Sequence, residues 1–348
     1  MRFIGVMTGT SLDGVDLICV DFNQNGDLDY QVQASITYPY ENEWVDQLKK
    51  AFTQDNKQLE VLSKEYGIYI GLQVLRFIDQ FQLEDIEYIA SHGYTVFHKP
   101  DLGITLQIGD GQEIANVTNI NTVYDFRAQD VALGGQGAPL VPIGDELLFS
   151  DYDVCLNLGG FANLSFTESG VRKAFDICPI NIVLNQYVSK LGFEYDDQGK
   201  IASSGSLCVE LLEELNQLEF YQGESPKSLG YEFVVDLIFP LIDKYQLSIQ
   251  DTLHTYVYHV VEQLYNKLEG KGTVLVTGGG AYNSYLIDLL NDRLGGVLVL
   301  PSKEIIEFKE ALIFALLGFL RVHNKVNCLK SVTKAKKDHS SGRICMVY

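Results

Sequence analysis

Three glycine-bearing loops are the segments of this sequence whose residue types and spacing most directly suggest chemistry. They run from Gly9 to Gly14, from Gly159 to Asn163 and from Gly278 to Gly280. Glycine lets successive backbone N–H groups approach an anion closely, so such loops can form a concave nest for phosphate oxygens. A single glycine turn more often just ends a hairpin, but the set of three favours a nucleotide site.

The commonest nucleotide and hydrolase motifs are absent from these loops. None reads GxxxxGK[ST], and none places GxGxxG within a strand–helix–strand unit. The GxSxG nucleophile elbow and the HExxH zinc motif are also missing. The sequence therefore argues against P-loop and Rossmann nucleotide sites and against a zinc hydrolase.

Four carboxylates stand next to glycine or apolar segments. Asp13 and Asp16, in the first loop, are either an outer-sphere partner of Mg²⁺ or turn residues, which is the commoner role. Asp176, in RKAFDICPINIVLN, is well placed as a general base, or it caps the helix-like run that follows. Glu310 precedes a strongly apolar run, either in a first helical turn or as one polar group aimed into a cleft.

Polar side chains also occur at several positions of the segments SHGYTVFHKP, TLQIGDG and VYDFRAQDVALGGQGAPLVP. The groups that could reach a sugar hydroxyl or a carboxylate are His92, Thr95, Gln107, Arg127 and Asp130. Arg127 is a candidate bidentate clamp for a substrate carboxylate. Its alternative is an ordinary salt bridge to Asp125 or Asp130.

The elements that must position these residues alternate between strand and helix. RFIGVM and VDLICVDF predict two antiparallel strands around the first loop, and VCLNL, GGFAN and LSF repeat that layout later. TVLVTGGGAYNS predicts a strand, a glycine turn and a helix that starts near Asn283 and Ser284. Apolar residues at helical spacing predict a helix over 252–268. The pattern indicates an α/β protein with a duplicated architecture and a ligand between its halves.

The chain has 348 residues and a formal net charge of −20. Such acidity argues against nucleic acid or anionic lipid as a partner, because both require a basic surface. The longest strongly apolar run, ALIFALLGFL, is too short to span a bilayer, and the N-terminal segment lacks a signal-peptide pattern. Six scattered cysteines suggest buried thiols in a reducing compartment, so we expect a cytoplasmic protein.

Nine segments together resemble the anhydro-N-acetylmuramic acid kinase family, within the superfamily of sugar kinases, acetate kinase and actin. They are GVMTGTSLDGVD, SHGYTVFH, TLQIGDG, DFRAQDVALGGQGAPLVP, NLGGFANLS, AFDICPIN, PKSLGYEF, VTGGGAYN and FKEALIFALLG. The resemblance implies an α/β, two-domain actin-like ATPase with a duplicated ribonuclease H-like core and an active site in the interdomain cleft. It implies a first domain of residues 1–128 plus 331–348 and a second domain of residues 129–330.

The resemblance also assigns roles to residues. It implies catalytic Asp176 and Glu310, and a sugar site with His92, Thr95, Gln107 and Arg127. It implies nucleotide contacts from Gly9, Thr10, Ser11, Leu12, Asp13, Gly14, Val15, Asp16, Gly159, Gly160, Asn163, Gly278, Gly279 and Gly280. The implied cofactors are ATP and Mg²⁺, the implied partner is a small sugar, and a homodimer is suggested.

The implied reaction opens 1,6-anhydro-N-acetylmuramic acid with water and phosphorylates O6, giving N-acetylmuramic acid 6-phosphate and ADP. The chain departs from the family pattern at Ile177-Cys178-Pro179-Ile180, at Tyr94, at Gly144-Asp145 and at Lys334. Ile180 replaces a glycine, so we expect it to crowd close backbone approach and to disfavour a positive φ. The alternatives are a kinase for another anhydrosugar, such as levoglucosan, and a non-catalytic nucleotide- or sugar-binding relative.

Overall fold

The computed structural model describes residues 1–9, 12–23, 28–223 and 229–347. The chain forms two compact units, one of Met1–Phe149 with Phe308–Tyr348 and the other of Ser150–Glu307. This division differs from the expected domains, because 129–149 and 308–330 belong to the first unit. The physical reason is packing within that unit, where the helix that contains Ala311 lies directly against the strand that contains Gly5.

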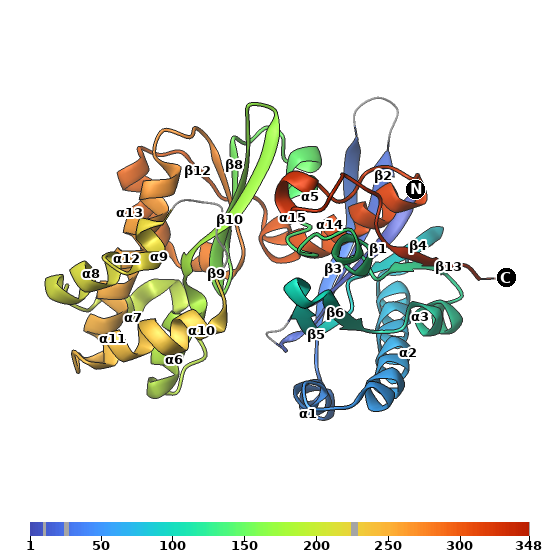
Figure 1. The fold of residues 1–348 in the computed structure, drawn as a ribbon, viewed down its shortest axis with the longest axis horizontal. Helices are drawn as coiled ribbons and strands as arrows, with labels where there is room; N and C mark the ends of the chain where they lie inside the picture. Colours follow the sequence, from blue (N-terminus) through green and yellow to red (C-terminus); the bar gives the residue numbers. More distant parts are fainter. Residues whose placement is uncertain (10–11, 24–27, 224–228, 348) are drawn as a thin grey trace. The chain divides into compact units, whose positions relative to one another are not determined.

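The first unit contains a six-stranded sheet in the order β13-β7-β4-β1-β2-β3 (Figure 1). Its strands are β1 (Arg2–Thr8), β2 (Gly14–Asn23), β3 (Asp29–Pro39), β4 (Ile86–Ser91), β7 (Asn121–Tyr124) and β13 (Arg343–Cys345). β1, β2 and β3 form an antiparallel meander, whereas β4 runs parallel to β1 and β7 runs parallel to β4. A separate hairpin joins β5 (Tyr94–Lys99) to β6 (Ile104–Ile108).

The second unit repeats this strand order in the sheet β10-β9-β8-β11-β12. Its strands are β8 (Val154–Leu158), β9 (Phe161–Glu168), β10 (Val171–Pro179), β11 (Val274–Thr277) and β12 (Leu298–Val299). Again the first three strands are antiparallel, and β11 and β12 follow in parallel. The predicted α/β fold with a duplicated ribonuclease H-like core, as in actin-like ATPases, is therefore confirmed by the topology.

Helices cover both sheets. The first unit contains α1 (Asn42–Ala51), α2 (Asn56–Phe81), α3 (Gly111–Thr118), α4 (Ala128–Ala132), α5 (Pro142–Leu148) and α15 (Lys330–Thr333). The second contains α6 (Asn181–Val188), α7 (Lys200–Ser203), α8 (Val209–Asn216), α9 (Glu219–Gln222), α10 (Tyr231–Phe233), α11 (Phe239–Asp243), α12 (Ile249–Leu268) and α13 (Ser284–Leu294). The chain passes from the second unit back to the first through α14 (Lys303–Val322).

Local sequence signals explain where several helices begin. Asp55 forms a capping box with Gln58 at the start of α2, and Ser248 accepts a hydrogen bond from Asp251 N at the start of α12. Asn283 caps α13 by accepting from Leu286 N. The predicted helices near Asn283 and over 252–268 are thus confirmed.

The side chains of β1 alternate between the two faces of the sheet, and packing buries both faces. Ile4 belongs to the core cluster that contains residues of α2. On the other face the Phe3 ring lies 5.9 Å from the Phe319 ring of α14, and a Cβ on Gly5 would lie 2.0 Å from Ala311 O. Only glycine permits this close approach of helix to strand. The approach fixes α14 against β1, the strand that leads into the first glycine loop.

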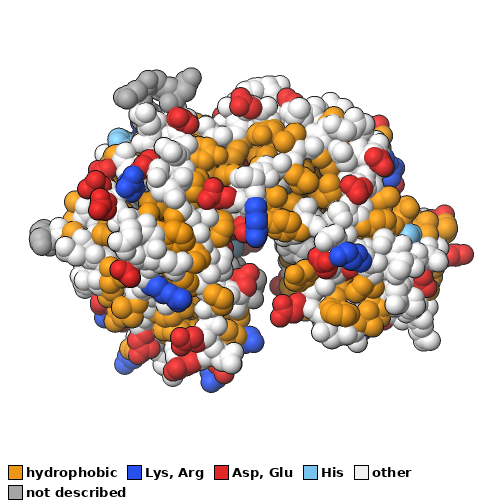
Figure 2. Space-filling model, turned by 180° about the vertical axis from the view of Figure 1, so that it is seen from behind, with side chains coloured by type: hydrophobic (Ala, Val, Ile, Leu, Met, Phe, Trp, Pro, Cys, Tyr) orange, Lys and Arg blue, Asp and Glu red, His pale blue; other side chains and the backbone are white. Residues whose placement is uncertain are grey.

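Acidic side chains are spread over the face drawn in Figure 2, whereas Lys and Arg side chains lie singly or in small groups. This distribution agrees with the net charge of −20. None of the described helices combines the length and the apolar character needed to cross a membrane.

Candidate active site

The glycine loops of the second unit converge at the ends of two neighbouring parallel strands. The turn after β8 contains only Gly159 and Gly160, because β9 begins at Phe161; Asn163 therefore lies in a strand and not in the predicted loop. The turn after β11 begins at Gly278, whose φ is 83°. Parallel pairing of β8 with β11 places the two turns next to each other; that they share a ligand stays a prediction.

Gly278 and Gly280 lie against the end of β8. A Cβ on Gly278 would fall 2.6 Å from Asn157 Oδ1, and a Cβ on Gly280 would fall 2.7 Å from the Cβ of Leu158. Asn181, at the start of α6, donates from Nδ2 to Leu158 O at 3.1 Å. Glycine at 278 and 280 thus lets this turn pack directly on the end of β8, whereas a Cβ on Gly279 would meet no atom closer than 3.9 Å.

Gly278→Ala should therefore destabilise the fold by about 1–3 kcal/mol, because the new Cβ meets Asn157 and the residue must keep a positive φ. We also expect the KM for ATP to rise. Gly279→Ala is the matched control, since its Cβ would lie 3.9 Å from the nearest atom, Asn181 Nδ2. Urea unfolding and nucleotide kinetics measure both effects. Equal behaviour of the two variants would contradict the close-approach argument.

Asp176 lies within β10 opposite Asn163 of β9. The register shifts between Asp176 and Cys178, and such bulges are over-represented beside active sites because they re-aim a side chain. Leu229 N donates to Asp176 Oδ2 at 2.8 Å. The alternative that Asp176 caps the following helix is wrong, because the N-cap of α6 is Ile180 and has no side-chain cap bond.

Ile180 replaces the family's glycine without backbone strain of the expected kind. Its φ is −127°, so the position does not require the left-handed conformation. The side chain is fully buried in the core, and Ile180 N donates to Gly160 O at 2.8 Å. The expected conflict with a positive φ is therefore not found.

The first glycine loop joins β1 to β2 in the first unit. Thr10 and Ser11 lie outside the described residues. Leu12 has a φ of 60°, a left-handed conformation that is uncommon for a residue with a side chain. Gly14, Val15 and Asp16 belong to β2 and not to the loop. Asp13 lies in the turn, and Asp16 Oδ1 accepts a hydrogen bond from Thr37 Oγ1 at 2.6 Å.

His92 and Arg127 form a hydrogen-bonded pair. Arg127 donates from Nε and from Nη2 to His92 Nε2, at 3.1 and 2.9 Å, and from Nη1 to Gly137 O at 2.6 Å. Burial and the nearby guanidinium hold the pKa of His92 well below its ordinary value. His92 is therefore neutral and accepts at Nε2, so its ring proton is on Nδ1.

Arg127 forms neither of the salt bridges considered as its alternative role. Asp125 pairs with Arg343 at 3.0 Å, and Asp130 accepts from Gly137 N and Thr333 Oγ1. Burial lowers the pKa of Arg127, and the carboxylate of Glu310 opposes that shift. An arginine keeps its charge in any case. The guanidinium is thus held in place by neutral acceptors, an arrangement suited to receiving an anionic group.

Glu310 lies in the middle of α14, eight residues in, and not in a first helical turn as one alternative had it. Desolvation raises its pKa, and the charges of Lys309 and Arg127 oppose this. Lys309 Nζ lies 3.1 Å from Asp145 Oδ1, and both side chains are buried. The raised pKa lets Glu310 hold a proton to a higher pH than an exposed glutamate.

Thr95 and Gln107 occupy opposite positions of the β5–β6 hairpin. Gln107 Nε2 donates to Thr95 Oγ1 at 3.4 Å and to Thr105 Oγ1 at 3.0 Å. The two residues are therefore adjacent to each other, as polar groups that could meet a sugar. No hydrogen bond described for the chain joins either of them to His92 or Arg127.

Sequence reasoning missed four residues that support these groups: Gly137, Asp145, Leu229 and Lys309. Their roles come from contacts far apart in the chain, such as Lys309 with Asp145 and Leu229 with Asp176. A signal did exist for Lys309, because it stands beside Glu310 directly before the strongly apolar run of α14.

Comparisons with known proteins identify the same family over nearly the full chain. The family model described as anhydro-N-acetylmuramic acid kinase matches residues 1–347. The enzyme of that name from Francisella tularensis subsp. novicida is 34% identical, covering 98% of this chain and 97% of its own length. The one from Acaryochloris marina is 36% identical, covering 92% and 93%. The chain belongs to the anhydro-N-acetylmuramic acid kinase family.

Solved structures are more distant. An activator of the 2-hydroxyisocaproyl-CoA dehydratase from Clostridium difficile, with bound ADPNP, is 14% identical at a TM-score of 0.45, covering 92% of this chain and 94% of that one. A Schistosoma mansoni hexokinase complexed with glucose is 11% identical at a TM-score of 0.35, covering 90% and 85%. Likeness at this level does not inform the site.

One departure from the anhydro-N-acetylmuramic acid kinase pattern has a visible backbone consequence. The family commonly has Thr-Gly-Ala where this chain has Thr333-Lys334-Ala335. Lys334 adopts a φ of 63°, the left-handed conformation that glycine takes without steric cost. The local backbone therefore keeps the shape that suits a glycine although the side chain has changed.

Proposed function

We propose that this member of the anhydro-N-acetylmuramic acid kinase family is an ATP-dependent kinase. It opens 1,6-anhydro-N-acetylmuramic acid with water and phosphorylates O6, giving N-acetylmuramic acid 6-phosphate and ADP. The observation that carries the proposal is Asp176, a carboxylate at a bulge of β10 and anchored by Leu229 N, on the strand pair that follows the Gly159-Gly160 turn. Murein recycling is the process that this reaction serves.

Asp176 supplies the base that this substrate needs. The O6 of an internal ether carries no proton that a base could remove. The proton that the base removes must therefore come from another group. Asp176 takes it from a water molecule that attacks C1, and the C1–O6 bond breaks. O6 gains the negative charge with which it attacks the γ-phosphorus, and the bond from that phosphorus to the β–γ bridging oxygen breaks, which releases ADP. Positioning and electrostatic stabilisation supply most of the rest of phosphoryl-transfer catalysis.

ATP and Mg²⁺ suit the groups present. We propose that backbone N–H groups of the Gly278–Gly280 turn hold a phosphate, because three successive glycines allow close approach to an anion. Asp13 and Asp16 offer the carboxylate oxygens that Mg²⁺ prefers, and we propose that they hold it directly or through water. When bound, Mg²⁺ neutralises charge on the phosphate oxygens. Gly9 and Leu12 would shape the loop around the phosphates, and Gly14 follows it at the start of β2.

We assign Arg127 to the lactyl carboxylate of the sugar. Arg127 keeps its positive charge, is held by His92 and Gly137, and lies near the half-buried Glu310. Levoglucosan lacks the lactyl carboxylate and would give Arg127 no anionic partner. Glu310, whose raised pKa eases proton exchange, is assigned to holding the water. Thr95 and Gln107 are assigned to sugar hydroxyls.

Arg127→Lys should reduce the preference for the carboxylate-bearing sugar. A charge-assisted hydrogen bond is worth about 1.5–3 kcal/mol, so the kcat/KM ratio of anhydro-N-acetylmuramic acid to levoglucosan should fall by about 10–100-fold. Competition between the two sugars measures this ratio, in which any general loss of folded enzyme cancels. Arg321→Lys is a control in the same unit. An unchanged ratio would remove Arg127 from carboxylate recognition.

An ADP-coupled assay tests the proposed function. Wild-type protein should release ADP only when an anhydrosugar is present, and fastest with anhydro-N-acetylmuramic acid. Turnover confined to levoglucosan would support the alternative of a kinase for another anhydrosugar. Binding of nucleotide and sugar without ADP release would identify a non-catalytic relative.

We further propose a cytoplasmic enzyme. All six cysteines are free thiols, and the proposed use of ATP fits that compartment. A homodimer remains our expectation, which gel filtration with light scattering can test.

A further inference from the structure

Asp130, Cys328 and His339 form a buried cluster in the first unit that the proposed reaction does not use. Their side-chain donor atoms all lie within 4.8 Å of one another. The residues are 0%, 2% and 6% exposed, respectively. A carboxylate oxygen, a sulfur and an imidazole nitrogen at one buried point are the donor types found in protein zinc sites.

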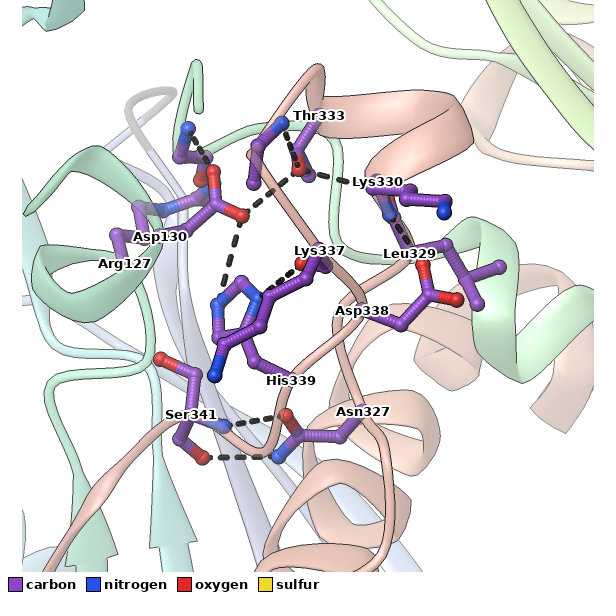
Figure 3. Close-up of polar contacts among 12 residues, drawn as sticks. Arg127, Asp130, Asn327, Leu329, Lys330, Thr333, Lys337, Asp338, His339 and Ser341 are labelled. Atoms are coloured by element: carbon purple, nitrogen blue, oxygen red, sulfur yellow. Dashed lines mark hydrogen bonds and ion pairs between the residues drawn. The ribbon is translucent and has the colours of Figure 1, made fainter. Parts of the chain in front are cut away.

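The backbone places two of these side chains next to each other. Cys328 and His339 form an antiparallel bridge, with Cys328 N donating to His339 O at 3.1 Å and His339 N donating to Cys328 O at 3.2 Å. The side chains of two directly opposed residues lie on the same face of an antiparallel strand pair. Asp130, from α4, faces this pair, and Figure 3 shows its carboxylate directed at the His339 ring.

The hydrogen bonds of His339 fix which ring nitrogen is available. Nδ1 lies 3.1 Å from Lys337 O, and a carbonyl can only accept, so Nδ1 carries a proton. Nε2 is buried, has no hydrogen-bond partner among the described residues, and lies 3.5 Å from Asp130 Oδ1. With Nδ1 carrying a proton, an unprotonated Nε2 would turn a lone pair toward the Asp130 carboxylate in a dry environment. This arrangement is unfavourable unless a positive charge lies between them.

We propose that this charge is a divalent metal ion, Zn²⁺ by its donor set, bound by Asp130, Cys328 and His339. Two ligand atoms about 2.0–2.1 Å from a tetrahedral zinc ion lie about 3.3 Å apart. The 3.5 Å between His339 Nε2 and Asp130 Oδ1 is close to that separation. Thiolate and imidazole together select zinc over Mg²⁺ and Ca²⁺.

The surrounding groups resemble the outer contacts that orient metal ligands. Asp130 accepts from Thr333 Oγ1 and from Gly137 N, both at 2.7 Å, while His339 Nδ1 donates to Lys337 O. Such second contacts fix the tautomer of a ligating histidine and the orientation of a ligating carboxylate. They leave His339 Nε2 and Asp130 Oδ1 facing each other (Figure 3).

The position of the cluster explains what the metal would do. After α14 the chain forms little regular structure, with only the short α15 and β13 between His323 and Val347. A metal that joins Cys328 and His339 to Asp130 would fasten this segment to α4. Asp130 also bonds Gly137 N, and Gly137 O accepts from Arg127, so the same ion would stiffen the support of Arg127.

Metal binding should release a proton. Burial, with a further contribution from Asp130, raises the pKa of Cys328 to about 12, whereas Arg127 and Ser341 oppose the rise. The thiol is therefore protonated without metal and must lose that proton to become a ligand.

The test uses full-length protein without a histidine tag. After stoichiometric ZnCl₂ and gel filtration, elemental analysis should find one zinc per wild-type chain, and Co²⁺ should give a thiolate-to-cobalt absorption in the near ultraviolet. Loss of a second-shell contact already weakens metal binding about 10–100-fold, so Cys328→Ser and His339→Gln should weaken it at least ~100-fold. Cys345→Ser and His323→Gln, in the same unit, should bind as wild type does.

Two results would overturn the proposal. Folded wild-type protein that retains no zinc and gives no cobalt–thiolate band would leave a proton between His339 and Asp130, as a simple ion pair. Retention of zinc by both Cys328→Ser and His339→Gln would place the ion elsewhere. These readouts do not depend on kinase activity, so they stand whether or not the proposed reaction is correct, and the wild-type cobalt spectrum needs no variant to fold.

Discussion

Asp176→Asn should reduce the turnover of anhydro-N-acetylmuramic acid by at least about 100-fold. General-base assistance is typically worth about 10²–10⁴-fold, and an amide cannot take the proton of the attacking water. The amide oxygen can still accept from Leu229 N, as Asp176 Oδ2 does at 2.8 Å, so the fold should persist. ADP release under saturating sugar and ATP measures the loss.

Asp292→Asn is the control for this prediction, because Asp292 is an exposed carboxylate of α13 in the same unit. It should turn over as wild type does. A labelled-water experiment gives an independent check, because solvent oxygen should enter at the anomeric carbon before mutarotation exchanges it. Near-normal turnover of Asp176→Asn, or product without solvent oxygen at that carbon, would exclude Asp176 as the base.

Lys309→Met should destabilise the protein by about 3–5 kcal/mol. Lys309 and Asp145 form an ion pair at 3.1 Å with side chains only 4% and 5% exposed, and removing one charge of a buried pair leaves the other without its counter-charge. Urea unfolding measures the change in the free energy of unfolding. The pair also adjoins Glu310, whose pKa Lys309 lowers, so the variant should raise the pKa of Glu310 further.

Lys303→Met, in the same helix, is the matched control. Lys303 lies 3.6 Å from Glu307, but the two side chains are 77% and 36% exposed, so its loss should cost at most about 0.5 kcal/mol. The double variant Asp145→Leu, Lys309→Met should recover most of the stability, because an apolar pair can replace a buried ion pair. Equal costs for the two lysine variants would show that burial does not set the effect.

Much of the fold could be predicted because its signals are local. Alternating apolar residues around glycine turns predicted the β1–β2 and β8–β9 hairpins, and Asn283 marked the start of α13. The repeated hairpin also indicated the duplicated core. The domain limits were harder to predict, because they depend on the packing of α14 against β1. The close approach at Gly5 that allows this packing has no sequence signature except the glycine itself.

The candidate site was predicted in its residues but not in their surroundings. Asp176, Arg127 and Glu310 were each identified with an alternative role, namely a helix cap, a salt bridge and a first-turn residue. The structure rejects all three alternatives: Asp176 bonds Leu229 N, Arg127 bonds His92 and Gly137 O, and Glu310 lies in mid-helix.

The sequence by itself determined the two glycine-turn hairpins, the strand before Gly278 and the family, since these depend on residue types at spacings of a few positions. The tertiary structure decided which groups surround each candidate: Arg127 reaches back to His92, Asp176 forward to Leu229, and Asp130 to Thr333 near the C-terminus. Side-chain hydrogen bonds of this kind form only after packing has brought distant segments together. Their partners therefore follow from the burial of the whole core and not from any local pattern.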